Sequence, residues 1–221
     1  MIISWRPLPK GCHLSAQLPL KRDELRSSSV TIFDFAQREL DAFYTPDLGE
    51  FLAKGRVGPS IFASFLPAFS AAMMHSSGLI LNDAAALFLA PDGGGKTTVV
   101  RHSTAGTTIL CDDQNILKKG GDAVIVYSTP WGLYTNGPKQ ARLGGLFLLE
   151  QAEHFKLIPL KPVDALEYLW YEHQGRLFLP RSLRTRAFEI LYDICYQAPV
   201  YRMRFPKDYV DWDVIDAAMA R

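Results

Sequence analysis

The chain has 221 residues, of which 48% are hydrophobic and 21% charged, proportions that are ordinary for a globular protein with a real core. Its net charge of +1 is too small to indicate binding to nucleic acid or to a membrane surface. Three widely spaced cysteines without metal-site spacing predict neither a disulfide framework nor a zinc site. No apolar run approaches the ~20 residues of a membrane span, and no signal pattern opens the sequence. We therefore expect a reduced, cytoplasmic protein.

The first third of the chain carries the weakest signals. We expect residues 1–69 to form a mixed, partly helical segment packed on a larger nucleotide-binding domain at 70–221. Within that segment, Thr45–Ala53 has the cap and proline of a short helix. A second helical piece is predicted over residues 58–74, with an interruption at Pro67.

Two apolar segments then predict a β-hairpin. They are His75–Leu81 and Ala84–Ala90, joined by the turn-prone pair Asn82-Asp83. The hairpin would place His75, the first residue of its first strand, near the end of its second strand. Three glycines follow, and Lys96 opens a segment with helical spacing. This strand–loop–helix order matches a phosphate-binding P-loop, with alanine in place of the first glycine of the pattern.

The loop has the residue types that nucleotide phosphates require. Glycines adopt positive φ and let successive backbone N–H groups point at an anion, to which the helix N-terminus adds its dipole. Lys96 supplies a charge for the β- and γ-phosphates, and the Thr97 hydroxyl can ligate Mg²⁺. The alternative is a glycine-rich turn with a solvated lysine. The residues expected to bind the nucleotide are Asp92, Gly93, Gly94, Gly95, Lys96, Thr97 and Thr98.

Two adjacent acids form the second candidate feature. Asp112 and Asp113 follow the predicted strand Thr107–Cys111, at the carboxyl end where α/β sheets place ligands. Phosphoryl transfer needs a metal ligand and a carboxylate that orients or deprotonates the acceptor, and the pair can supply both. Because neighbours on a regular strand point to opposite faces, this requires the strand to be turning there. The alternative is a turn cap beside a solvated acid.

The remaining chain mixes strands with helices without strict alternation. We therefore expect an α/β fold with a mixed sheet, flanking helices and a substantial antiparallel component. Strands are expected at 115–117, 123–127, 145–149 and 199–205, and helices at 161–171, 181–195 and 209–219.

Together these motifs resemble the HPr kinase/phosphorylase catalytic domain, and more closely the small stand-alone HPr-kinase-like proteins, which share the fold of phosphoenolpyruvate carboxykinase. The resemblance covers roughly residues 70–206 and rests on the order of HSSG, APDGGGKTT, ILCDDQNIL, YSTPWG, GGLFLLEQ and PVYRMRF. The family's usual serine is Thr97 here, and Gly132 stands where histidine is common. We find no counterpart of the C-terminal loop that engages HPr, so HPr is not the expected substrate.

The resemblance implies a kinase that uses ATP and Mg²⁺ to phosphorylate a hydroxyl, either a serine of a peptide or protein or a small molecule. Asp112, Asp113 and His75 would be catalytic, with His75 orienting the aspartates. Thr97 and Asp113 would ligate the metal, and Asp112 is preferred as the base. Trp131 and the loop to Lys139 would border the acceptor. Arginines that can balance transition-state charge are Arg142, Arg181, Arg184 and Arg204.

Two other functions stay open. A carboxykinase-like decarboxylating enzyme would need extra metal ligands, arginines for a carboxylated substrate and a much longer chain. A non-catalytic P-loop module, regulatory or for assembly, would bind nucleotide without turnover. Consumption of ATP with and without a hydroxyl acceptor separates these alternatives. The partners expected are a nucleotide and the acceptor, a homo-oligomer is left open, and neither nucleic acid nor a membrane is expected.

Overall fold

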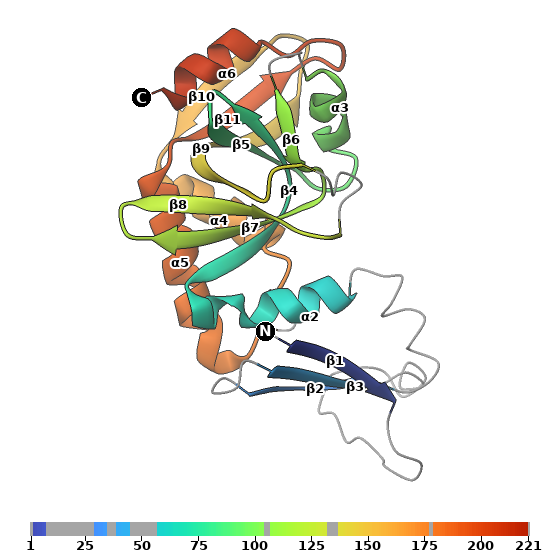
Figure 1. The fold of residues 1–221 in the computed structure, drawn as a ribbon. Helices are drawn as coiled ribbons and strands as arrows, with labels where there is room; N and C mark the ends of the chain where they lie inside the picture. Colours follow the sequence, from blue (N-terminus) through green and yellow to red (C-terminus); the bar gives the residue numbers. More distant parts are fainter. Residues whose placement is uncertain are drawn as a thin grey trace. The chain divides into compact units, whose positions relative to one another are not determined.

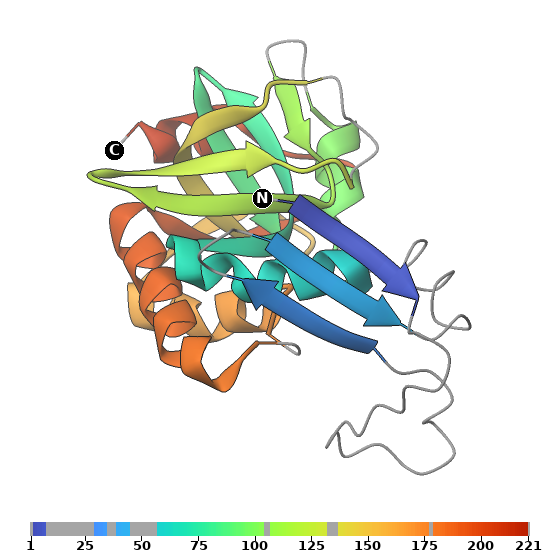
Figure 2. The same ribbon diagram turned by 60° about the horizontal axis from the view of Figure 1, so that its bottom comes forward.

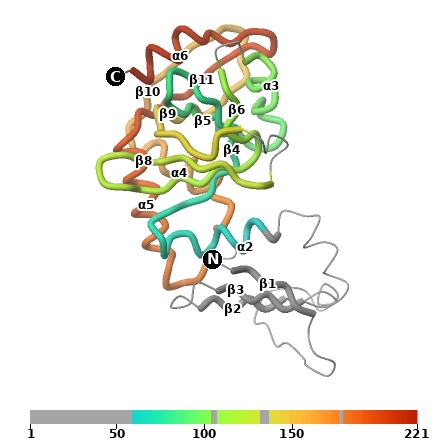
Figure 3. Tube along the Cα trace, in the orientation of Figure 1, coloured from blue at the N-terminus to red at the C-terminus, as the bar shows by residue number. Residues whose placement is uncertain are grey.

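The computed structural model describes residues 2–7, 29–34, 39–44, 57–103, 107–131, 137–176 and 179–220. The chain divides into two compact units, Met1–Phe62 and Ala63–Arg221. Figure 3 traces it in colour from α2 (Val57–Phe65) onward. None of the helices in the described ranges is long and apolar enough to cross a membrane.

The first unit contains a three-stranded sheet. Its strands are β1 (Ile2–Pro7), β2 (Ser29–Asp34) and β3 (Glu39–Tyr44). β3 lies in the middle, parallel to β1 and antiparallel to β2. The helix predicted at Thr45–Ala53 lies outside the described residues.

The second unit contains one large mixed sheet. Its strands are β4 (Ala71–Leu81), β5 (Ala84–Leu89), β6 (Thr108–Cys111), β7 (Gln114–Gly120), β8 (Ala123–Ser128), β9 (Gln140–Gln151), β10 (Lys156–Leu160) and β11 (Val200–Phe205). In the described residues the order is β10-β11-β9-β5-β4-β7-β8, with β6 also paired to β4 and β8 also paired to β9. β9 is parallel to both β5 and β11, and the other pairs are antiparallel. The structure thus confirms the predicted α/β class with a mixed sheet and flanking helices.

Helices cover both faces of this sheet (Figures 1 and 2). They are α3 (Lys96–Arg101), α4 (Pro162–Glu172), α5 (Arg184–Gln197) and α6 (Trp212–Met219), with short 3₁₀ turns η1 (Leu66–Phe69) and η2 (Arg181–Leu183). One buried cluster joins the sheet to α4 and α5, and a second joins it to α3 and α6. β5 contributes to both, because Leu87 and Leu89 point to the first cluster while Ala86 and Phe88 point to the second. Burial on both faces explains why this strand is an unbroken apolar run.

The parallel strands bring three chain segments to one edge of the sheet. β5 ends at Leu89, where the glycine-rich loop begins, and β9 and β11 end at the same edge. The side-chain amide of Gln151, at the end of β9, donates to the Gly93 carbonyl oxygen at 3.3 Å. Phe205, at the end of β11, packs closely against Gly95. A Cβ on Gly95 would lie only 2.6 Å from Cζ of the Phe205 ring. The loop is therefore packed against the ends of both neighbouring parallel strands.

The predicted hairpin of β4 and β5 is confirmed. Asn82 and Asp83 form its turn with φ values of 44° and 65°, a conformation that asparagine and aspartate tolerate. The helix predicted to continue to residue 74 is wrong, because Ser70 adopts φ 56° and ends the 3₁₀ turn. Residues 71–74 instead extend β4, and all four are buried.

Two of the three cysteines lie in the described ranges, and both are buried free thiols. Cys111 lies at the end of β6 with its Sγ 3.9 Å from the Thr129 carbonyl oxygen. Its side chain is fully buried, as expected of a packing residue in a strand. Burial raises the pKa of Cys195 to about 12, so this thiol stays protonated at neutral pH.

Phe147 should be central to stability, because it stacks on Phe88 at 5.3 Å and on Tyr201 at 5.7 Å between ring centroids. Phe147→Ala should lower the free energy of unfolding by about 3–5 kcal/mol, measured by urea denaturation. Tyr196→Ala, at a site with 75% exposure, is the control and should change it by less than about 0.5 kcal/mol. Equal effects of the two variants would contradict this account of the core.

Candidate active site

The glycine-rich loop has the backbone geometry that its sequence predicts. Gly93 and Gly95 have φ values of 78° and 104°, which only glycine adopts readily. At Gly94 a Cβ would lie 2.5 Å from the Cβ of Ala90, so space rather than φ requires glycine there. Helical bonding starts with the bond from the Val99 N–H to the Gly95 carbonyl. The N–H groups at the start of α3 therefore have no partner within the helix.

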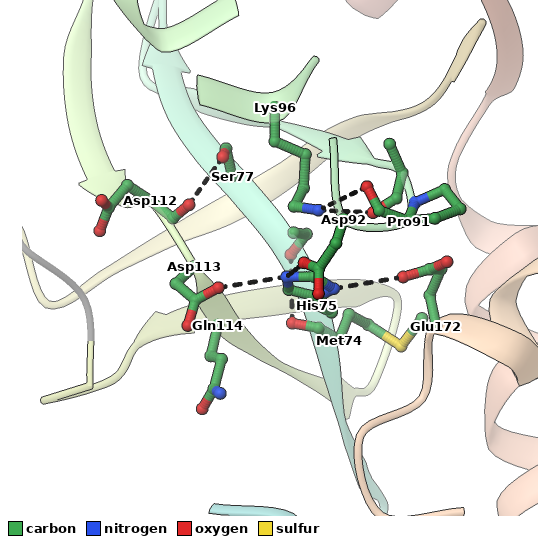
Figure 4. A network of polar contacts seen from close by, with 12 residues as sticks. Met74, His75, Ser77, Pro91, Asp92, Lys96, Asp112, Asp113, Gln114 and Glu172 are labelled. Atoms are coloured by element: carbon green, nitrogen blue, oxygen red, sulfur yellow. Dashed lines mark hydrogen bonds and ion pairs between the residues drawn. The ribbon is translucent and has the colours of Figure 1, made fainter. Parts of the chain in front are cut away.

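Lys96 is buried against its own loop. Its ammonium donates to the carbonyl oxygens of Ala90, at 2.5 Å, and Pro91, at 3.2 Å (Figure 4). Only 8% of the residue is exposed. The alternative of a solvated lysine is therefore wrong.

His75 is the centre of a cluster to which four chain segments contribute (Figure 4). From β4, its Nε2 lies 3.2 Å from Oδ1 of Asp113, in the bend between β6 and β7, and 3.5 Å from Oδ1 of Asp92, in the loop. Its Nδ1 lies 3.5 Å from Oε2 of Glu172, the last residue of α4. The hairpin thus returns His75 to the glycine-rich loop, as the sequence predicts.

The carboxylates around His75 control its charge. Burial alone would lower its pKa, but the hydrogen bonds to Asp113 and Glu172 outweigh burial and the positive charge of Lys96. The pKa of His75 therefore lies above its ordinary value of 6.5. In the protonated ring both nitrogens are donors, which matches carboxylates on both sides of it.

The two adjacent aspartates lie in different surroundings. They form a bend, so the turning strand that the sequence argument required is present. The carboxylate of Asp113 faces His75, whereas that of Asp112 points away from it (Figure 4). The backbone carbonyl of Asp112 accepts a hydrogen bond from the Ser77 hydroxyl at 2.8 Å. The Asn115 amide donates to the carbonyls of Ser76, at 2.8 Å, and Cys111, at 3.4 Å, and so fixes the bend to β4.

Sequence reasoning missed Glu172. It is buried at the C-terminal end of α4, where the helix dipole disfavours a negative charge. An acid at that position needs a compensating partner, and His75 provides it. In the sequence, an acid at the C-terminal end of a predicted helix indicates that it needs a partner. The partner, His75, lies almost one hundred residues away and could not be identified from the sequence.

Within the described residues, neither Thr97 nor Trp131 contacts His75. Thr97 is exposed in the first turn of α3, and Trp131 is 38% exposed. Part of the loop from Trp131 to Lys139 lies outside the described residues. Arg204 pairs with Glu150 at 2.9 Å. In the described ranges no contact joins any of the candidate arginines to His75, and these are Arg142, Arg181, Arg184 and Arg204.

The described residues contain no group of three or more histidine, cysteine, aspartate or glutamate side chains arranged to hold a metal ion. Mg²⁺ commonly takes only one or two protein oxygens and completes its shell with phosphates and water. The donors near the loop, a threonine hydroxyl and aspartate carboxylates, are of the type that Mg²⁺ prefers.

Comparisons with known proteins show a likeness to solved structures. No protein-family model and no curated protein matches the chain. Among solved structures, the chain is similar to the HPr(Ser) kinase/phosphatase from Coxiella burnetii. The identity is 12% and the TM-score 0.36, over 67% of this chain and 93% of that one.

The cluster predicts a specific titration of His75. Replacing Glu172 by Gln removes one of the hydrogen bonds that raise its pKa, so the pKa of His75 should fall in an NMR titration of the ring. Glu189→Gln, at an exposed site on α5, is the matched control. His173 is an internal reference, because burial lowers its pKa to about 4.

The raised pKa of His75 also determines how its contribution to the stability of the fold changes with pH. Because the folded-state pKa of His75 is raised, its stabilising contribution is fully present below pH 6.5 and is lost as the pH rises through the folded pKa. His75→Gln should therefore cost more free energy of unfolding at about pH 5.5 than at about pH 9. An equal cost at both would show that His75 is not charged in the fold.

Proposed function

We propose that this chain is a kinase that transfers the γ-phosphoryl group of ATP, with Mg²⁺, to a hydroxyl of a peptide, protein or small molecule. The observation that carries the proposal is the bridge made by His75. The Nε2 atom of His75 contacts Asp92 in the glycine-rich loop and also contacts Asp113. His75 thereby connects the glycine-rich loop, which suits phosphates, to the Asp113 carboxylate, which suits deprotonation of a hydroxyl. The order of motifs along the sequence supports the same class of enzyme.

Binding of the phosphates is assigned to the loop and the start of α3. The N–H groups that have no helical partner would donate to phosphate oxygens. Lys96 would exchange its two carbonyl partners for the β- and γ-phosphates, which are stronger acceptors for an ammonium. Mg²⁺, held by the Thr97 hydroxyl and the Asp112 carboxylate, would supply neutralising charge to the phosphates.

The base is assigned to Asp113, the reverse of the preference drawn from the sequence. Its carboxylate is oriented by His75 and is one-third exposed, so an acceptor can reach it. As the acceptor oxygen forms its bond to the γ-phosphorus, the bond from phosphorus to the ADP oxygen breaks and Asp113 takes the hydroxyl proton. His75 holds the carboxylate in place and is in turn held by Glu172 on its other side.

The phosphate assignment is tested by Lys96→Ala. The variant should lose a charge-assisted interaction of about 1.5–3 kcal/mol with the phosphates. Calorimetry with MgATP should show this loss, whereas Lys118→Ala, on the exposed face of β7, should bind as the unmodified protein does. Because Lys96 also bonds to its loop, the melting temperature of each variant is measured alongside. Unchanged affinity in a folded variant would remove the loop from the proposal.

The base assignment is tested with amide replacements of both aspartates. Asp113→Asn should reduce phosphoryl transfer to a serine-containing peptide library by about 10²–10⁴-fold and leave MgATP affinity within a few fold. Asp112→Asn should instead weaken the Mg²⁺-dependent part of nucleotide binding. Asp122→Asn, in the exposed turn between β7 and β8, is the control. Full transfer by Asp113→Asn would refute its role, and binding without transfer by the unmodified protein would favour a non-catalytic module.

A further inference from the structure

A second feature of the same sheet edge has no part in the chemistry described so far. It is a pocket of about 350 Å³ between α4 and the strands β9, β10 and β11. This volume lies at the lower end of the range for small-molecule sites. The walls are partly apolar and partly charged, and they include Leu148, Glu150, Leu160, Asp164, Tyr168 and Arg202.

The pocket lies directly beside the glycine-rich loop. Leu148 in its wall pairs in register with Leu89, the last residue of β5. The hydroxyl of Tyr168 donates to the Leu89 carbonyl at 3.5 Å. Gln151, whose amide reaches Gly93, is the next residue along the strand after Glu150. One strand therefore carries both a wall of the pocket and a contact with the loop.

The pocket and the proposed base lie on opposite sides of β5. His75 and its partner Asp113 belong to the β4 side, whereas the pocket is formed beyond β5, on β9 and β11. Strands in a sheet are about 4.8 Å apart, so the centre of the pocket is roughly 10–15 Å from β4. A ligand with its phosphates on the loop and its terminal phosphate toward Asp113 extends in the other direction toward this pocket. An acceptor hydroxyl must instead approach from the Asp113 side.

The chemistry of the walls suits a nucleobase. Leucine side chains offer apolar contact and the ring of Tyr168 offers a planar aromatic one. Burial with Glu172 nearby raises the pKa of Tyr168 to about 12, so its phenol is neutral. Glu150 is already paired, with Arg204 at 2.9 Å and with Nε of Arg202 at 3.7 Å. Asp164 is left to accept from an amino or ring N–H. The terminal nitrogens of Arg202, which make no hydrogen bond in the described part of the chain, can donate to ring nitrogens or a carbonyl.

We propose that this pocket receives the purine base of the nucleotide whose phosphates bind the glycine-rich loop. The inference rests on the proposed function and adds where the rest of the nucleotide lies. Asp164 and Arg202 in the pocket wall would face a base that carries hydrogen-bond donors and acceptors on different edges, as purines do.

Calorimetry on the full chain separates the base from the phosphates by comparing MgATP, MgGTP and magnesium tripolyphosphate. The unmodified protein should bind at least one of the nucleotides about tenfold or more tighter than tripolyphosphate. Stacking of a base on an aromatic ring contributes enough binding free energy for a difference in affinity of this size. Leu160→Trp, which fills the pocket, should abolish that advantage and leave tripolyphosphate affinity within about twofold. Val163→Trp, on the exposed side of α4, is its control.

A second variant covers the case in which Leu160→Trp does not fold. Asp164→Ala, on the exposed first turn of α4, should weaken nucleotide binding selectively, and Glu167→Ala on the same helix should not. The pocket inference is overturned if tripolyphosphate binds as tightly as both nucleotides, or if the pocket variants leave the advantage of the nucleotide intact. Failure of the proposed function looks different, because then the unmodified protein binds neither nucleotides nor tripolyphosphate.

Discussion

The pairing of β5 with β9 is the interaction on which the rest of the second unit depends. β5 and residues 145–149 of β9 are buried on both faces, and the parallel direction of the two strands ends them at one edge of the sheet. The glycine-rich loop, the His75 cluster and the pocket of α4 all lie along that edge. A parallel pair has no tight turn of its own, so the intervening chain is free to form β6, β7 and β8, which carry the aspartate bend.

The features that sequence could predict are those encoded by neighbouring residues. The hairpin turn, the glycine-rich loop and the amphipathic helix α5 each show their pattern within a short window, and the structure has all three. Strand β10 was missed because its pattern KLIPL is short and contains a proline, which an edge strand tolerates. The contact of Glu172 with His75, the packing of Phe205 against Gly95 and the orientation of Asp113 toward His75 all depend on which strands become neighbours. That information is not present in any local window.

The surroundings of His75 show how a buried charge is tolerated in this fold. Three carboxylates, from Asp92, Asp113 and Glu172, meet one imidazole, with the ammonium of Lys96 close by. Burial of such a group is costly unless the opposite charges are paired and hydrogen-bonded. Each element contributes one member, so the cluster forms only when β4, the loop, the aspartate bend and α4 are all in place. It thereby couples local geometry to completion of the tertiary fold.

The bonds of Lys96 to its own loop have a consequence for selectivity. The ammonium already donates to the carbonyl oxygens of Ala90 and Pro91, so an entering anion competes with the protein itself and not only with water. A singly charged or strongly hydrated ion gains little by displacing those carbonyls, whereas a multiply charged oxyanion that engages the backbone amides at the same time gains much. Under the proposed function, these contacts of Lys96 would therefore favour a polyphosphate over the small anions of its surroundings.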